Sequence, residues 1–176
     1  MKFSALIFAL LPAWTLAGCT TAERAVSAPF SVASLTNSQG QPVGSARLFA
    51  TGDGMMLTVD VMSMPAGIHG IHIHATGKCD APAFTTAAGH LNPAGHQHGS
   101  MNSAGPHLGD LPNLVVSEAG TGTIAARIPG TVSELEAQLF DMDGTAIVVH
   151  AGPDDYKTDP SGNSGGRIAC GVLTRA

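Results

Sequence analysis

From about residue 30 onward, hydrophobic and polar residues alternate in short runs that are separated by turn residues. The clearest run is 55–64, where Leu57, Val59 and Val61 share one face and polar residues occupy the other. This period of two is typical of a β-strand with one buried face. Similar runs predict strands at 30–37, 45–51, 68–74, 114–118, 122–128, 145–150 and 167–173.

Turn signals separate these runs, for example SQGQP at 38–42, GDG at 52–54 and Asp143-Gly144 before 145–150. Thr131 and Glu134 have the spacing of a helix cap, but we interpret them as ordinary loop polarity. Short strands with regular turns favour an all-β antiparallel sandwich or flattened barrel. Two segments, 75–113 and 151–166, show no such period and adjoin strands that end in histidine, which indicates a functional site there.

Composition agrees with a single domain of this kind. A length of 176 residues suits one ordinary domain better than two, and no internal repeat is visible. The 22 glycines and 11 prolines favour many turns over a helical bundle, while 44% hydrophobic residues can supply a core. The formal net charge of −5 argues against binding to a nucleic-acid backbone.

The N-terminus resembles an export signal. Residues 3–17 are mostly apolar, contain Pro12, and are too short to read as a membrane-spanning helix. Leu16 to Cys19 is similar to the lipobox of bacterial lipoproteins, in which the cysteine becomes the acylated N-terminus; the alternative is an ordinary secretory signal. We expect a signal peptide at 1–18, a tether at 19–30 and a domain at 31–176. The exported chain would be held on a membrane by Cys19, and Thr20 favours the outer membrane.

The chain has three cysteines. If Cys19 carries the lipid, Cys79 and Cys170 remain as a pair in an oxidising compartment, where a disulfide is favoured. Such a bridge would close a loop of about 90 residues and stabilise the fold by about 4–5 kcal/mol at most. The alternative is two free, buried thiols.

Histidine is the residue type that points to chemistry. Seven of the eight histidines lie between residues 69 and 107, and the eighth is His150. His72 and His74 alternate along one expected strand, so both imidazoles project from the same face. Four imidazoles favour Cu(II), whereas three imidazoles with a carboxylate such as Asp110 form a closed zinc site. Spacing alone leaves open which histidine would bind which metal.

Five motifs in this order and spacing resemble the copper/zinc superoxide dismutases, particularly the bacterial periplasmic type. They are GIHIH at 70–74, GHLNP at 89–93, HG at 98–99 with GPHLGDLP at 105–112, VVHAG at 148–152 and GNSGGRIACGV at 162–172. The resemblance covers residues 31–174 and implies an eight-stranded antiparallel Greek-key barrel with two long functional loops. It also implies superoxide as the substrate, with one copper and one zinc per subunit.

The resemblance also implies a role for individual residues. The copper ligands would be His72, His74, His90 and His150. The zinc ligands would be His90, which bridges the two metals, with His98, His107 and Asp110. Asp154 would join a copper ligand to a zinc ligand, and Arg167 would hold the anionic substrate. The disulfide Cys79–Cys170 would tie the first long loop to the last strand.

In such an enzyme, one superoxide reduces Cu(II) and leaves as oxygen, and a second reoxidises Cu(I) and leaves as hydrogen peroxide, with His90 moving a proton. Positive charges that could attract the anion are Arg167, Lys78 and Lys157, of which we interpret the two lysines as solvated surface groups.

An alternative of another class is a lipoprotein that stores metal without turnover. A zinc hydrolase would need a general base beside an open zinc position. Few aromatic residues and the lack of a long apolar strand edge favour neither a monomer nor a homodimer.

Two histidines fall outside the motifs. His69 is an odd number of residues from His72, so we expect it to face away from the copper ligands and to be solvated or hydrogen-bonded. His96 could compete for zinc, but the eight-residue spacing from His90 favours His98. A role for His69 or His96 in copper capture is a hypothesis that unchanged copper loading in alanine variants would reject.

Overall fold

The computed structural model describes residues 28–176, so the expected signal peptide, the lipobox and most of the tether lie outside the described residues. Within this range the strands are β1 (Ser31–Asn37), β2 (Pro42–Thr51), β3 (Gly54–Val61), β4 (Gly67–His69), β5 (Ile71–His74), β6 (Leu114–Val116), β7 (Gly122–Pro129), β8 (Ala146–His150), β9 (Arg167–Val172) and β10 (Thr174–Arg175). The other elements are the 3-10 turn η1 (Thr85–Ala87) and the helix α1 (Val132–Leu139). Residues 28–176 contain no helix with the length and hydrophobicity needed to cross a bilayer.

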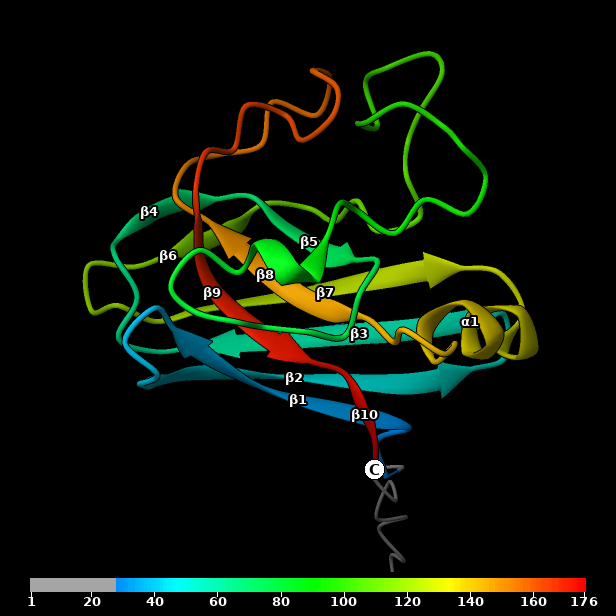
Figure 1. The fold of residues 1–176 in the computed structure, drawn as a ribbon, viewed down its shortest axis with the longest axis horizontal. Helices are drawn as coiled ribbons and strands as arrows, with labels where there is room; N and C mark the ends of the chain where they lie inside the picture. The colour runs from blue at the N-terminus through cyan, green and yellow to red at the C-terminus, as the bar shows by residue number, and fades with distance from the viewer. Residues whose placement is uncertain (1–27) are drawn as a thin grey trace, which may run out of the picture.

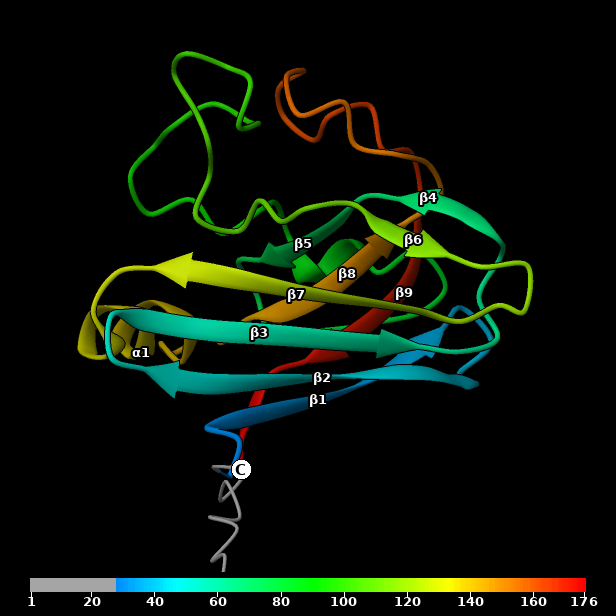
Figure 2. The ribbon, with the colours of Figure 1, turned by 180° about the vertical axis from the view of Figure 1, so that it is seen from behind.

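The strands form a curled antiparallel sheet, which confirms the expected all-β fold (Figures 1 and 2). The sheet order is β5-β8-β9-β1-β2-β3-β7, with β10 paired to β1, while β4 and β6 form a separate pair. Strands distant in sequence, such as β1 and β9, are therefore neighbours. The interior is filled by aliphatic side chains from both halves of the curled sheet, including the fully buried Leu35, Leu57 and Ile147.

The alternation expected for 55–64 is seen in β3. Leu57, Val59 and Val61 are buried, and Leu57 lies opposite Leu48 of β2 in the register of the pair. The outward residue Asp60 forms an ion pair with Arg47 on β2. One face of this half of the sheet therefore packs in the core, and the other is polar.

The strand expected at 68–74 is divided into β4 and β5 at Gly70. At this residue the chain passes from one sheet to the other: β4 pairs with β6, and β5 pairs with β8. Gly70 donates its N–H to the carbonyl of Gly152 and accepts from the N–H of His150. A Cβ atom at this position would lie 2.8 Å from the Cβ of Ser164, so the close approach of the loop 151–166 requires glycine.

The interpretation of Thr131 and Glu134 as loop polarity is wrong, because these residues begin α1. The Thr131 side chain accepts from the Glu134 N–H, and the Glu134 carboxylate accepts from the Thr131 N–H, which makes a complete capping box. The helix is stable because Leu135 and Leu139 are buried in the core. The free energy gained by burying two leucines one turn apart therefore outweighs the low helix propensity of the neighbouring glycines and prolines.

The second long irregular segment and the part of the first that follows η1 lie together on one side of the sheet, at the top of Figure 1. The pairing of Cys79 with Cys170 is confirmed: a disulfide joins the first segment to β9 across 91 residues, with a Cα–Cα distance of 5.7 Å. Cys170 is buried with Phe84, Ala87 and Val148 in a small second core. The start of β1 pairs with β10 at the opposite end of the molecule from the loops (Figure 1).

Candidate metal centre

Four histidines from three distant segments meet where β5 and β8 run side by side. His72 and His74 lie on β5, and His150 ends β8, the neighbouring strand. The chain that follows η1 returns to β5, so that His90 lies opposite His74 in an isolated bridge. One ligand atom from each of the four rings lies within 4.8 Å of the others.

Each of these rings leaves one buried nitrogen without a hydrogen-bond partner among the described residues. The four atoms are His72 Nδ1, His74 Nε2, His90 Nε2 and His150 Nε2. A buried polar atom without a partner is costly, and such atoms are rare in folded proteins. Four of them in one place fit a bound metal ion, and a set of imidazoles suits copper.

The second nitrogen of each ring has a fixed partner. His72 Nε2 lies 2.8 Å from Asp154 Oδ2, His74 Nδ1 lies 2.9 Å from the Ala88 carbonyl, and His150 Nδ1 lies 3.0 Å from the Gly165 carbonyl. These acceptors require a proton on the bonded nitrogen, so the other nitrogen presents its lone pair. Such bonds fix both the tautomer and the direction of a metal-binding imidazole.

A second cluster is centred on Asp110. Its Oδ1 atom lies 2.9 Å from His90 Nδ1, 3.0 Å from His98 Nδ1 and 3.3 Å from His107 Nδ1. His107 Nδ1 is also 3.4 Å from His90 Nδ1. Ligands about 2.05 Å from a tetrahedral zinc ion are separated by about 3.3 Å, so these four separations, from 2.9 to 3.4 Å, are compatible with a zinc site.

His72 also lies within reach of His90, His98 and Asp110, but its Nε2 atom is bonded to Asp154. His107 therefore completes this second cluster better than His72 does. His90 is shared: Nδ1 faces Asp110 and Nε2 faces the first cluster.

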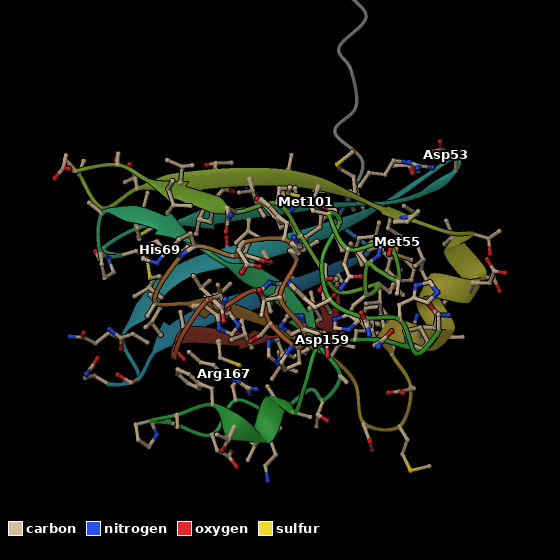
Figure 3. The ribbon with its side chains drawn as sticks, turned by 90° about the horizontal axis from the view of Figure 1, so that it is seen from above. Asp53, Met55, His69, Met101, Asp159 and Arg167 are labelled. Carbon is tan, nitrogen blue, oxygen red and sulfur yellow. A yellow bond between two sulfur atoms is a disulfide. The ribbon has the colours of Figure 1, made fainter. Side chains whose placement is uncertain are left out.

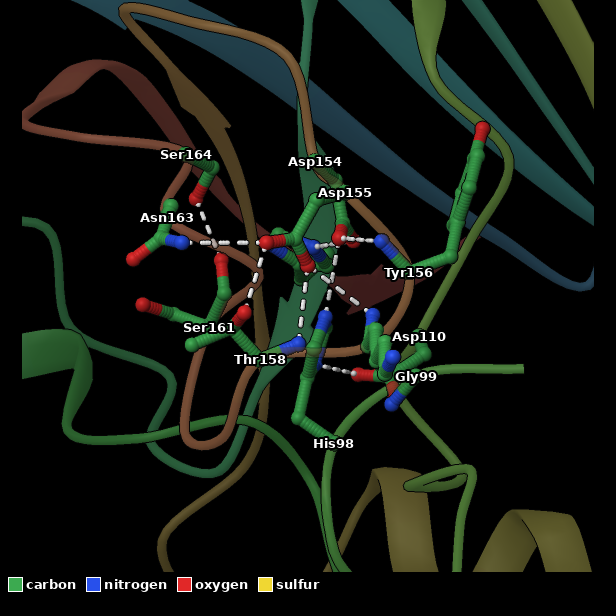
Figure 4. A network of polar contacts seen from close by, with 12 residues as sticks. His98, Gly99, Asp110, Asp154, Asp155, Tyr156, Thr158, Ser161, Asn163 and Ser164 are labelled. Carbon is green, nitrogen blue, oxygen red and sulfur yellow. Dashed lines mark hydrogen bonds and ion pairs between the residues drawn. The ribbon is translucent and has the colours of Figure 1, made fainter. Parts of the chain in front are cut away.

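Asp154 joins the two clusters (Figure 4). Its Oδ2 atom accepts from His72 Nε2 at 2.8 Å, and its Oδ1 atom accepts from His98 Nε2 at 2.9 Å. The carboxylate is almost completely buried. Gly162 packs against Oδ1 with a φ of +61°, a place where a side chain would collide with the carboxylate.

Asn113 and Tyr156 support Asp154, and the sequence pattern did not reveal either. The Asn113 side chain exchanges two hydrogen bonds of 2.9 Å with the backbone of Asp154. The Tyr156 N–H donates to Asp154 Oδ1, and its hydroxyl accepts from the Asn113 N–H at 2.7 Å. Tyr156 is the only tyrosine of the chain, which is a weak signal that could have drawn attention to it.

Burial sets the charge of the site. It lowers the pKa of His72 to about 3, of His74 to about 2 and of His150 to about 4. Burial alone would raise the pKa of Asp110, but the hydrogen bonds from His90 and Gly99 outweigh it and hold that pKa below its usual value. At neutral pH the rings of His72, His74 and His150 are therefore neutral and the Asp110 carboxyl group is ionised, as metal binding requires.

The metal-free protein should lose stability in mild acid. The pKa values of His72, His74 and His150 are lower in the folded chain than the ordinary 6.5, so between those values the unfolded chain binds more protons. Stability is therefore complete above about pH 6.5 and falls towards about pH 4, by about 1.4 kcal/mol per pH unit for each such histidine. Urea unfolding of the metal-free protein at about pH 7.5 and about pH 5 measures this, and equal midpoints would contradict it.

Arg167 stands beside the first cluster. Its two terminal nitrogens donate to the carbonyls of Phe84 and Ala88, each at 2.6 Å. The Ala88 carbonyl also accepts from His74 Nδ1, so the guanidinium and this ring share one anchor. Arg167 lines a cleft of about 450 Å³ together with His74, His90 and His150.

Arg167 differs from most other cations of the described region in what holds it. Arg47, Lys78, Arg127 and Arg175 each pair with a carboxylate. Arg167 is held instead by neutral carbonyl oxygens. Its charge therefore remains available to an anion in the cleft. Lys78 and Lys157 do not line this cleft.

The two remaining histidines have different surroundings. His69 is buried, with Nδ1 2.8 Å from the His150 carbonyl and Nε2 2.9 Å from the Pro65 carbonyl, so neither nitrogen is free to capture a metal. His96 is exposed at the mouth of the cleft, and its Nδ1 atom bonds to the Pro106 carbonyl.

Comparison with known proteins agrees with the architecture and identifies the family. The profile of the family described as copper/zinc superoxide dismutase (SODC) matches residues 43–173. Superoxide dismutase [Cu-Zn] 2 of Aquifex aeolicus is 42% identical over 144 residues, which cover 80% of this chain and 84% of that protein. The superoxide dismutase [Cu-Zn] of Escherichia coli K12 is 38% identical, over 76% of this chain and 80% of that protein.

Solved structures give the same result for the fold. The crystal structure of a SOD-like protein from Bacillus subtilis superposes with a TM-score of 0.76 and 37% identity, covering 81% of this chain and 97% of that one. The family match extends over most of the described region, from β2 to the end of β9, and includes both histidine clusters and Arg167. The chain is therefore a member of the copper/zinc superoxide dismutase family.

Proposed function

We propose that this chain catalyses the dismutation of superoxide, in which two superoxide ions and two protons yield oxygen and hydrogen peroxide. The observation that carries the proposal is a set of four buried imidazole nitrogens that have no hydrogen-bond partner among residues 28–176, beside a cleft lined by Arg167. The copper ligands would be His72, His74, His90 and His150. The zinc ligands would be His90, His98, His107 and Asp110.

Copper, when bound, supplies the one-electron chemistry that zinc and protein side chains lack. Arg167 supplies a fixed positive charge that attracts and orients the anion at the open side of the histidine cluster. When His90 Nε2 is not a metal ligand, it can hold a proton and donate it to the hydrogen peroxide that forms. Asp154 keeps His72 and His98 in their ligating orientation throughout.

The geometry argues against a zinc hydrolase. Asp110, His90, His98 and His107 supply a complete tetrahedral set, which leaves no position for a nucleophilic water. Within the described residues the zinc cluster therefore fits a structural role, which holds His90 and the first long loop in place.

Superoxide decay in the presence of the full chain tests the proposal. We expect rapid decay with the copper- and zinc-loaded protein and none above background with the zinc-loaded protein. Free copper at the same concentration is the control. Copper bound at one ion per chain, with no acceleration beyond free copper, would show that the protein stores metal without turnover.

We infer that the protein is exported and held on a membrane, the outer membrane rather than the inner one, by a lipid on Cys19. A disulfide fits an oxidising compartment. The described domain begins at the end opposite to the loop 151–166, which contributes Asp159 and Ser161 to the cleft, so an anchor there would leave the cleft facing away from the bilayer. We expect radiolabelled palmitate to be incorporated into the wild-type chain and not into Cys19→Ala; equal labelling of both would reject the lipid on Cys19.

A further inference from the structure

We propose that Asp159 weakens the binding of small anions in the copper cleft and thereby sets the rate at which superoxide enters. Among the described residues that line the cleft, those with a permanent charge are Arg167 and Asp159. Both are labelled in Figure 3, which looks at the molecule from above. An entering anion is therefore attracted by one and repelled by the other. This inference rests on the proposed function of the cleft.

Asp159 is fixed in position by the zinc-binding segment. Its Oδ1 atom accepts a hydrogen bond of 2.7 Å from the backbone N–H of His98. The same atom lies 3.8 Å from His107 Nε2. The side chain lines the cleft and is 50% exposed, so its charge is not enclosed in the protein. A carboxylate held in this position repels each anion that enters the cleft.

The loop before Asp159 is also well ordered by local bonds. The Asp155 carboxylate accepts from the N–H groups of Lys157 and Thr158 and from the side chains of Thr158 and Asn163 (Figure 4). The Asn102 side chain donates to the Lys157 carbonyl. These contacts keep Asp159 at the rim instead of letting it move away with the loop.

The charge of Asp159 is not neutralised nearby. The acids Asp53, Asp60, Asp80 and Glu136 each pair with an arginine or lysine. The partners of Asp159 within the described region are the neutral His98 amide and the His107 ring. A hydrogen bond from a neutral amide stabilises the carboxylate but leaves its negative charge in place. Asp159 therefore offsets part of the attraction by Arg167.

Replacing Asp159 by asparagine separates charge from position, because the amide oxygen can still accept from the His98 N–H. Asp159→Ala removes both the charge and the acceptor. Glu118→Gln is the matched control, since Glu118 is an exposed carboxylate in the turn between β6 and β7 and its loss changes the net charge equally.

The probe is azide, a small monovalent anion, titrated into the copper- and zinc-loaded full chain and followed by the absorption of the Cu(II)–azide complex. At low ionic strength we expect Asp159→Asn and Asp159→Ala to bind azide about threefold to tenfold more tightly than the wild type, and Glu118→Gln to bind it with unchanged affinity. The difference should shrink at high salt. Metal content, measured on each variant, should stay at one copper and one zinc.

An azide affinity that is unchanged or weaker in both Asp159 variants would overturn the inference. Tightening in Asp159→Ala alone would also overturn it, because it would show that the position of the His98 segment matters and not the charge. If azide binds more tightly to Asp159→Asn while the wild type fails to dismutate superoxide, the proposed function is wrong but the role of Asp159 stands. If the wild type dismutates superoxide and azide binding does not respond, only the role of Asp159 is wrong.

Discussion

Replacing Arg167 by alanine should lower kcat/KM for superoxide about 10- to 100-fold while leaving copper and zinc content unchanged. The guanidinium touches none of the nitrogens assigned to the metals, so its loss leaves both clusters intact. What disappears is the permanent positive charge that lines the cleft. The measurement is superoxide decay by pulse radiolysis or stopped flow over a range of ionic strength.

Arg167→Lys and Arg47→Ala are the informative controls. Lysine keeps the charge, but a single ammonium cannot reproduce the forked donation to the Phe84 and Ala88 carbonyls, so an intermediate loss of about threefold to tenfold is expected. Arg47 lies on the outer face of β2 in an ion pair with Asp60, and its removal should change kcat/KM by less than about twofold. Wild-type activity in Arg167→Ala would contradict the role assigned to the arginine.

Replacing Asp154 by asparagine should weaken zinc binding about 10- to 100-fold. The carboxylate accepts from the N–H groups of His72 and His98 at once. An asparagine has one acceptor oxygen, and its amide group would face the N–H of one ring as a second donor. One ring must then turn or change tautomer, which removes its lone pair from the metal.

Zinc affinity can be measured by competition with a coloured chelator, and the Cu(II) absorption spectrum reports on His72 separately. Asp143→Asn is a suitable control, because Asp143 is an exposed carboxylate in the turn before β8. We expect that variant to bind zinc like the wild type. An unchanged zinc affinity and copper spectrum in Asp154→Asn would mean that the bridging carboxylate does not hold the two rings in place.

Much of this protein is determined by local pattern. The period-two runs predicted the main strands, because a strand with one buried face must alternate apolar and polar residues. The cysteine count predicted the disulfide, and the spacing of the histidine motifs predicted membership of the family; both were confirmed. Motif spacing carries this information because ligands on one strand, such as His72 and His74, are placed together by the backbone alone.

Other features depend on contacts between distant segments. The sequence contains the capping box of α1, but only the burial of Leu135 and Leu139 makes it a helix. The division at Gly70 follows from the approach of the loop 151–166, which no local pattern records. Asn113 and Tyr156 acquire a role only because the fold brings the backbone of Asp154 to them.

The sequence by itself therefore determined the kind of fold, the set of side chains able to bind metal, and the family. The tertiary structure decided which ring nitrogens have no hydrogen-bond partner among the described residues, which polar atoms lie close to Asp110, and that Asp159 shares a cleft with Arg167. The physical reason is that a residue type fixes what a side chain can donate, accept or ligate. Its tautomer, its direction and the charges it faces are fixed by neighbours as far as 82 residues away, as for His72 and Asp154.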